Sequence, residues 1–298
     1  MADANKCTFS KKAAVRPPFF MFMKKIFVCL FIFLAALRAD CQIFDNQNGL
    51  LDVVYGSDVR NTLVFTAQMQ VNTPYEGNTL NQYKHERLIV NVRSYDCATF
   101  VETMVAVAMA ANANGRRGDR YVLNEKFRDT LTKLRYHGGA VRGYASRIHY
   151  FADWLKEAQK NKIFADVTSD LGGVVFDKPI NYMTQNSEKY PKINTRSVLD
   201  SLKRYEAALN AARRYYIPKK DVAKIERKLQ DGDLIGITSG VPGLDCNHQG
   251  FVVMRGKRAH LLHASSEKKK VVLSSEPLVD YLNRIDKHTG IIVGRLLN

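Results

Sequence analysis

A nearly continuous apolar run occupies residues 100–111, between the polar stretch Ser94–Thr99 and the pair Asn114-Gly115. Residues that can cap a helix stand before the run and Asn-Gly stands after it, so the pattern predicts a helix with a defined start and end. Apolar residues cover nearly every side of this helix, and we therefore expect it to be buried at the centre of the fold. Cys97 falls in its first turn.

The pattern elsewhere predicts helices before residue 232 and strands after it. Helices are expected at 50–70, 127–134, 148–158, 198–216 and 219–229, and a candidate strand at 88–92 precedes the Cys97 helix. Strands of an antiparallel sheet are expected at 233–238, 248–254, 260–265, 271–273 and 290–293. We therefore expect an α+β fold in which the central helix packs on the sheet and further helices are added.

The two longest predicted strands form a hairpin with its turn at Gly256-Lys257. In that register Gly250 faces His263, so His248 and His263 lie on one face as diagonal neighbours, about 7–8 Å apart at the backbone. Two imidazoles at that separation can touch. His260 points to the other face of the sheet.

The N-terminal region has the pattern of a secretory signal peptide. Lys24-Lys25 precede the apolar run Ile26–Leu37, and small and polar residues follow around Ala39. Twelve apolar residues are too few for a bilayer core of about 30 Å, so a retained membrane helix is the weaker alternative. We expect residues 1–42 to be an extension and signal peptide, and residues 43–298 to be one exported domain, periplasmic or extracellular, without stable membrane insertion.

The charge of the chain is strongly positive. The full chain has 45 Lys and Arg and 29 Asp and Glu. Residues 43–298 contain 38 of the basic and 27 of the acidic residues, which gives a net charge of +11. Such a charge favours anionic partners. No helix-turn-helix, zinc-ligand or aromatic-sheet signature accompanies it, which argues against nucleic acid. Two explanations of the positive charge remain: binding of an anionic envelope polymer, and a basic surface that is simply solvated. The oligomeric state is unknown.

The position of Cys97 suggests nucleophilic chemistry. A helix N-terminus favours the thiolate, although a small buried hydrophobe is the usual role of a single cysteine. A nucleophile also needs a base and a group that orients the base. We assign His248 as the base and His263 as the group that orients it, the arrangement of papain-like enzymes. A metal at the two histidines is the weaker alternative because no third ligand stands at the required spacing, so no cofactor is expected.

Four motifs resemble the NlpC superfamily of cell-wall cysteine amidases: Asp96-Cys97-x-Thr99-Phe100-Val101-Glu102, Gly232-Asp233-Leu234, Asn247-His248-x-Gly250 and Leu262-His263-Ala264-Ser265. Gly143–Tyr150 and Trp154 are similar to its N-acetylmuramoyl-L-alanine amidase-like branch. The resemblance covers about residues 50–298. It implies a papain-like NlpC-type fold and a Cys97, His248, His263 triad. It also implies hydrolysis of the amide between muramic acid and L-alanine in peptidoglycan fragments, the muropeptides.

Two alternatives stay open beside this function. A γ-D-glutamyl-diamino acid endopeptidase would use the same triad, and a non-catalytic envelope-binding module would keep only the fold. Arg147, His149 and Tyr150 are the candidates for substrate binding, since an arginine near a peptide-binding cleft suits a carboxylate. Glu102 lies about 140° round the helix from Cys97, so we expect it to pair with a buried base instead.

Cys246 departs from the family pattern, in which a small or aliphatic residue is common near this position. It precedes His248 by two residues, so its side chain is expected to share the face that looks toward Cys97. A reversible Cys97–Cys246 disulfide is one hypothesis, because export makes oxidation feasible. A small buried residue that fills a slot beside the base is the more economical interpretation.

Overall fold

The computed structural model describes residues 58–114 and 120–297. The chain divides into two units, residues 1–44 and 45–298, and every described residue belongs to the second. The predicted signal peptide and the predicted boundary after residue 42 lie outside the described ranges and stay predictions. Within those ranges no helix combines the length and the apolar character needed to cross a bilayer.

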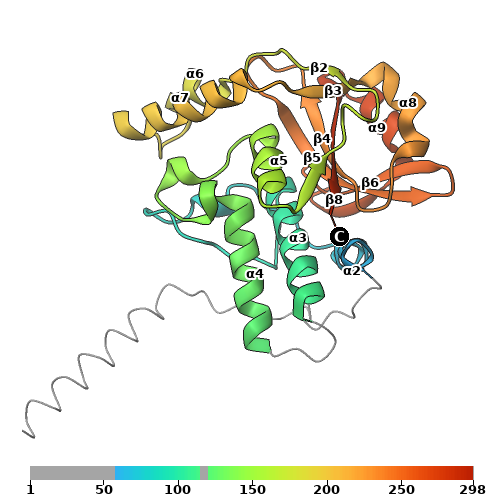
Figure 1. Ribbon diagram of the computed structural model, residues 1–298, viewed down its shortest axis with the longest axis horizontal. Helices are drawn as coiled ribbons and strands as arrows, with labels where there is room; N and C mark the ends of the chain where they lie inside the picture. The colour runs from blue at the N-terminus through green and yellow to red at the C-terminus, as the bar shows by residue number, and fades with distance from the viewer. Residues whose placement is uncertain (1–57, 115–119, 298) are drawn as a thin grey trace, which may run out of the picture. The chain divides into compact units, whose positions relative to one another are not determined.

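The described residues form helices in the first part of the chain and mainly strands in the last (Figure 1). The α-helices are α2 (Val59–Met69), α3 (Cys97–Asn114), α4 (Arg120–Arg135), α5 (Phe151–Lys160), α6 (Tyr182–Gln185), α7 (Arg196–Ala211), α8 (Val222–Ile225) and α9 (Leu278–Arg284). The strands are β1 (Phe164–Asp166), β2 (Val174–Val175), β3 (Tyr215–Pro218), β4 (Leu234–Ser239), β5 (Cys246–Arg255), β6 (Arg258–Ser265), β7 (Lys270–Pro277) and β8 (His288–Leu296).

One antiparallel sheet joins these strands. Its order is β2-β3-β8-β4-β5-β6-β7, with β1 paired to β8. The hairpin register is the expected one, since the pairs run from Phe251 with Leu262 to Arg255 with Arg258 around the turn. The expected combination of helices with an antiparallel sheet is therefore confirmed, as is the position of the hairpin turn.

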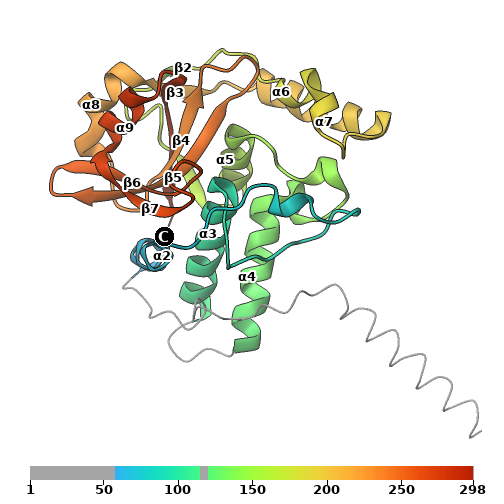
Figure 2. The same ribbon diagram turned by 180° about the vertical axis from the view of Figure 1, so that it is seen from behind.

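The two faces of the sheet are covered by different helices, as Figure 2 shows from behind. On one face Ile235 and Ile237 belong to a core that includes residues of α8 and α9. On the other face the Phe100 ring of α3 lies 5.9 Å from the Phe251 ring, and the Phe151 ring of α5 fills the space above Gly236. A Cβ atom at Gly236 would lie 2.3 Å from that ring, so only glycine allows α5 to pack this close.

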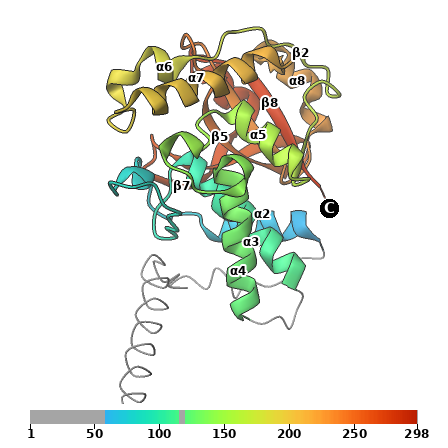
Figure 3. The ribbon, with the colours of Figure 1, turned by 60° about the vertical axis from the view of Figure 1, so that its left-hand side comes forward.

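Helix α3 is the buried central helix that its sequence predicts. Its start is a reciprocal cap, because the Thr99 N–H donates to Asp96 Oδ1 at 2.8 Å and the Asp96 N–H donates to Thr99 Oγ1 at 2.9 Å. Phe100, Val101 and Met104 are fully buried. Figure 3 shows α3 and α4 side by side. The cap fixes the first turn, and with it the position of Cys97.

A buried ion pair joins α3 to α4. Arg135 Nε lies 2.7 Å from Glu102 Oε2, and both side chains are almost fully buried. Arg135 Nη1 also donates to the Ile89 carbonyl at 2.5 Å. Burial raises the pKa of the Glu102 carboxyl, and the Arg135 charge opposes this rise. The expectation that Glu102 pairs with a buried base is confirmed.

Arg135→Ala should destabilise the fold by about 3–5 kcal/mol, because it leaves the Glu102 carboxylate buried without its partner. Urea unfolding followed by circular dichroism measures this loss. Lys133→Ala is the matched control, since Lys133 pairs with Asp129 on the exposed side of the same helix and should cost less than about 1 kcal/mol. Equal losses in the two variants would contradict a structural role for the buried pair.

Four expected elements differ from the structure. The helix expected at 219–229 is the short α8 between two 3₁₀ turns, Lys219–Asp221 and Glu226–Lys228. Residues 88–92 are not a strand: the Ile89 carbonyl accepts a hydrogen bond from the Arg135 side chain, and the carbonyl of Arg87, just before the segment, accepts one from the Tyr136 hydroxyl. Tyr215–Pro218 is strand β3 instead of the end of a helix, since Ile217 pairs with Ile291 and is buried in the sheet core. Helix α5 begins only at Phe151, so Ile148 precedes it.

Candidate functional site

Cys97 is the first residue of α3, and its thiol is surrounded by backbone N–H groups. Those of Gln249, Cys97 and Ala98 act on the sulfur and favour its ionised form. Burial and the nearby Asp96 carboxylate outweigh them and raise the pKa of the Cys97 thiol to about 12. The helix start thus favours the thiolate, as expected, and burial together with Asp96 opposes it. The proton of the thiol has to be removed when the sulfur reacts.

His248 and His263 meet where β5 and β6 separate. His248 Nε2 lies 2.5 Å from His263 Nδ1, and the ring centroids are 4.7 Å apart at 83°. Both residues stand just beyond Phe251 and Leu262, the last pair of the hairpin on this side. The structure thus brings the two predicted histidines into direct contact. Burial lowers the pKa of His263 to about 4 and that of His248 well below its usual 6.5, so both rings are neutral at pH 7.

The thiol lies beside the residue that follows His248, since the Gln249 N–H acts on the Cys97 sulfur. In the described ranges His248 Nδ1 makes no hydrogen bond, and neither histidine bonds to the Cys97 sulfur. The imidazole nitrogen that His263 does not engage is therefore the one left for the thiol. This geometry is compatible with the predicted triad, whose roles stay predictions.

Two tyrosines near the thiol were not anticipated from the sequence. The Tyr281 ring of α9 lies 5.4 Å from the His263 ring and 6.4 Å from the His248 ring. Tyr75 follows α2, and it forms a parallel bridge with Tyr95, two residues before Cys97. Burial, then the charges of Cys97 and Asp96, raises the pKa of Tyr75 to about 12. The sequence around Tyr75 and around Tyr281 does not indicate a role at the site, because only the fold brings these two residues near the thiol.

Arg147 lines a cavity of 460 Å³ that we call the Arg147 cavity. Its wall includes Asp96 and Ala98, the neighbours of Cys97, together with Arg147, His149 and these further residues: Asn78, Leu80, Asn81, Glu102, Tyr144, Ile148, Lys189, Tyr190, Pro191 and Lys192. Two of the three predicted substrate-binding residues therefore face a space beside the nucleophile.

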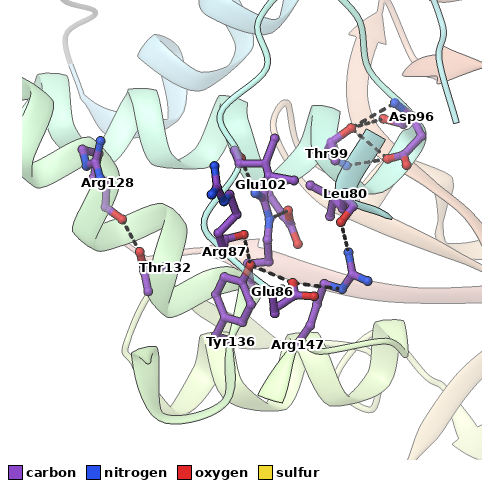
Figure 4. A network of polar contacts seen from close by, with 12 residues as sticks. Leu80, Glu86, Arg87, Asp96, Thr99, Glu102, Arg128, Thr132, Tyr136 and Arg147 are labelled. Atoms are coloured by element: carbon purple, nitrogen blue, oxygen red, sulfur yellow. Dashed lines mark hydrogen bonds and ion pairs between the residues drawn. The ribbon is translucent and has the colours of Figure 1, made fainter. Parts of the chain in front are cut away.

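The Arg147 guanidinium also holds the wall of this cavity together (Figure 4). Its Nη1 donates to the Leu80 carbonyl at 3.1 Å, and its Nη2 donates to Asn81 Oδ1 at 2.6 Å. Its Nε lies 3.5 Å from Glu86 Oε1. Leu80 and Asn81 belong to the 3₁₀ turn Thr79–Asn81, so Arg147 has a structural task besides any contact with substrate.

His149 and Tyr150 differ in their surroundings. His149 Nε2 donates to the Tyr144 carbonyl at 3.2 Å, and burial, then Arg147, lowers its pKa to about 3. The Tyr150 hydroxyl donates to Glu206 at 2.7 Å and accepts the Met183 N–H at 2.8 Å. Tyr150 is buried and lies outside the lining of the Arg147 cavity. The structure therefore does not bring Tyr150 to the site, where its hydroxyl would have to be free.

Cys246 and Cys97 are both free thiols in the structure. Burial, followed by the Asp245 carboxylate, raises the pKa of Cys246 well above its usual range, and the charge of Cys97 contributes to the same rise. The disulfide between the two cysteines stays a prediction. No group of three or more His, Cys, Asp or Glu side chains within residues 58–114 and 120–297 is arranged to hold a metal ion.

Comparison with known proteins gives a family and several related structures. Residues 66–291 match the family model described as N-acetylmuramoyl-L-alanine amidase-like. An N-acetylmuramoyl-L-alanine amidase from Bacteroides uniformis is 31% identical, with a TM-score of 0.74 over 80% of this chain and 99% of the other. A Bacteroides fragilis protein described as a candidate xylanase is 33% identical, with a TM-score of 0.70 over 77% and 99%.

A more distant structure, a protein from Legionella pneumophila, is 21% identical with a TM-score of 0.59 over 81% of this chain and 90% of the other, and it shows the shared fold alone. The comparison with curated proteins gave no significant match. The family model spans most of the chain, and the Bacteroides uniformis amidase is matched over nearly its whole length. The chain therefore belongs to the N-acetylmuramoyl-L-alanine amidase-like family of peptidoglycan hydrolases.

Proposed function

We propose that this protein hydrolyses the amide between N-acetylmuramic acid and L-alanine in muropeptides, with Cys97 as nucleophile, His248 as base and His263 as the residue that orients the base. The observation that carries the proposal is the 2.5 Å contact between His248 and His263 at the strand ends beside the Cys97 helix start. The family supplies the amidase chemistry and the peptidoglycan substrate.

In this mechanism the thiol and the base start neutral. His248 Nδ1 accepts the Cys97 proton as the sulfur bonds to the lactyl carbonyl carbon, while His248 Nε2–H donates to His263 Nδ1. The imidazolium then protonates the leaving nitrogen, the C–N bond breaks, and a peptide that begins with L-alanine departs. Water attacks the thioester, His248 takes its proton, and the muramic acid carboxylate and the thiol are released.

The negative oxygen that forms in each step needs hydrogen-bond donors in fixed positions. Backbone N–H groups around the Cys97 sulfur, among them that of Gln249, are already held by α3 and β5. We assign the Tyr75 hydroxyl as the side-chain donor, because Tyr75 pairs with Tyr95 and its pKa responds to Cys97. A phenol with a raised pKa keeps its proton and remains a donor at neutral pH.

The proposed enzyme has a papain-like fold, is exported and needs no cofactor. A papain-like NlpC-type fold accounts for a nucleophile at the start of a buried helix with its histidines on neighbouring strands. Export, followed by removal of residues 1–42, would bring the enzyme to its substrate in the periplasm or outside the cell. We expect no cofactor, since the three proposed side chains supply the nucleophile and every proton transfer.

Cleavage of the γ-D-glutamyl bond is the second candidate, because the same triad performs it. Glycoside hydrolysis, suggested by the similarity to the candidate xylanase, is less well supported. It needs two carboxyl groups that face the sugar. Asp96 and Glu102 line the Arg147 cavity, but Asp96 caps α3 and Glu102 pairs with Arg135. We therefore favour amide hydrolysis over both, and over a binding module that would not need the triad.

Mass spectrometry of defined muropeptides after incubation tests the function. Release of an intact peptide beginning with L-alanine supports the amidase. Release of a peptide beginning with the diamino acid would transfer the assignment to the endopeptidase. Shortened glycan chains with intact stems would favour glycoside hydrolysis, and complete absence of products would favour the binding module.

When the solution is made more acidic, kcat/KM should fall with a midpoint below pH 6.5. His248 acts as base only when neutral, and burial, followed by the neighbouring His263, lowers its pKa below the usual 6.5. As pH falls from 7, the ring therefore stays neutral past the point where an exposed histidine would ionise. Rates measured from pH 4 to pH 8, with circular dichroism to confirm folding at each pH, check this. A midpoint at or above pH 6.5 would contradict a buried base.

A further inference from the structure

A second cavity, of 300 Å³, adjoins the proposed base. We call it the His288 cavity, and its wall includes His248, Asn247, Tyr281, Lys287 and His288. The Tyr281 ring lies 5.7 Å from the His288 ring at an interplanar angle of 29°, which holds both rings in place. The Arg147 cavity is lined by the neighbours of Cys97, and the His288 cavity by His248 itself. Each of the two reacting side chains thus has a cavity beside it.

Two buried polar atoms of this wall have no hydrogen-bond partner in the described ranges. They are Asn247 Oδ1, an acceptor, and His288 Nδ1, on a residue that is only 3% exposed. An unsatisfied buried polar atom costs about 1–3 kcal/mol, so such atoms in a cavity wall are typical of a site that supplies the partner from outside. Burial is the main cause that lowers the pKa of His288 to about 4, so its ring is neutral at pH 7. The Asn247 oxygen accepts, and the His288 ring donates when its proton is on Nδ1, so the two atoms match the N–H and the C=O of a peptide unit.

The cation available at this cavity is Lys287. Arg284 and Glu267 also line it, but these two side chains pair with each other at 3.2 Å, and Arg284 pairs with Glu276 at 3.0 Å. No ion pair of Lys287 occurs among residues 58–114 and 120–297, and its side chain is exposed. Its charge adds to the lowering of the pKa of both His248 and His288, after burial, so the ammonium group lies within electrostatic reach of both rings. A carboxylate of a bound ligand can therefore meet Lys287.

The direction of the reaction decides which part of the substrate enters this cavity. The leaving nitrogen receives its proton from His248, so the peptide attached to that nitrogen departs on the side of the base. The acyl half, which bonds to sulfur, lies on the side of Cys97. The cavity that shares His248 is therefore the one next to the leaving peptide.

We propose that the His288 cavity binds the leaving stem peptide, an acidic L-alanyl-γ-D-glutamyl segment. Asn247 Oδ1 accepts its amide N–H, His288 Nδ1–H donates to its carbonyl, and Lys287 pairs with the free α-carboxylate of the glutamyl residue. The inference rests on the proposed function, because it takes His248 as the group that protonates the leaving nitrogen. It adds a specificity for charge in the stem that the triad alone does not supply.

Two substrates that differ only in this carboxylate test the inference. They are N-acetylmuramoyl-L-alanyl-γ-D-glutamyl-L-lysine and its D-isoglutaminyl analogue, in which the α-carboxylate of the glutamyl residue is a carboxamide. The wild type should show a kcat/KM about fivefold higher for the acid than for the amide. An exposed charge pair contributes about 1 kcal/mol, which corresponds to this ratio. Lys287→Met should abolish the preference, so that the ratio of kcat/KM for the acid to kcat/KM for the amide falls from about five to about one. Lys257→Met, the same change at the exposed hairpin turn, should leave both rates unchanged.

His288→Phe separates hydrogen bonding from charge. Phenylalanine keeps a ring against Tyr281 and removes the ring nitrogens, so KM should rise about tenfold for both substrates while kcat changes little. The preference for the acid should persist in this variant, because Lys287 is intact. Circular dichroism reports whether the buried substitution folds, and the exposed Lys287→Met decides the question if it does not.

The outcomes separate a wrong assignment of the His288 cavity from a wrong proposed function. Cleavage of both substrates at the muramoyl bond with equal efficiency, unchanged by Lys287→Met, would overturn the assignment of this cavity and leave the proposed function intact. A loss of the preference in Lys257→Met as well would also overturn it, since the effect would then be one of overall charge. Cleavage of neither substrate by the wild type would refute the proposed function and the inference with it.

Discussion

Cys97→Ala is expected to lower kcat/KM on a muropeptide by more than about a thousandfold, because no other group in the proposed mechanism can form the thioester. The fold should persist, since the cap between Asp96 and Thr99 that fixes the first turn of α3 does not involve the Cys97 side chain. Chromatography of the released peptide gives the initial rates and measures the loss of activity. Thermal unfolding of the wild type and the variant shows whether the fold persists.

Cys246→Ser is the matched control for that experiment. It changes the other thiol near the site and should keep most of the activity if Cys246 only fills space beside the base. Activity with and without reductant adds a test of the disulfide hypothesis. Restoration of wild-type activity by reductant, absent in Cys246→Ser, would support a Cys97–Cys246 bond. More than about one part in a thousand of wild-type rate in Cys97→Ala would remove Cys97 from the role of nucleophile.

His248→Ala should cost nearly as much as the loss of Cys97, because the thiol pKa of about 12 leaves almost no thiolate without a base. His263→Ala should cost less, about ten- to a hundredfold. The His263 ring fixes the orientation of His248 through one contact, and packing of His248 near Tyr281 preserves part of that orientation. Steady-state kcat and KM for the two variants measure the difference.

His260→Ala provides the comparison within the same strand. His260 lies outside the histidine pair, and its Nδ1 donates to the Ser274 carbonyl at 2.9 Å. Its loss should lower stability but leave kcat/KM per folded molecule close to that of the wild type. A larger loss in His263→Ala than in His248→Ala would mean that the base and the orienting residue are exchanged. A loss in His260→Ala as large as either would contradict the hairpin register.

Local sequence determined those elements whose cause is local. The buried character of α3 follows from an apolar run with a cap before it, and the hairpin follows from two apolar strands around Gly256-Lys257. Glu102 could be removed from the catalytic set by helix geometry alone, since five residues carry its side chain away from Cys97. His248 and His263 could be paired because the hairpin register is set by its turn.

Tertiary structure decided what depends on partners distant in sequence. Residues 88–92 have the composition of a strand, but the Ile89 carbonyl accepts from Arg135, the Arg87 carbonyl just before the segment accepts from Tyr136, and no strand forms. The Cys97 thiol keeps its proton because burial and Asp96 outweigh the helix N-terminus, a balance that no local pattern contains. Tyr75, Tyr281 and His288 reach the site from three separate segments, and Tyr150 is drawn away by Glu206. Sequence spacing identifies groups on one element, whereas the surroundings that set their protonation and their access arise only when the elements pack.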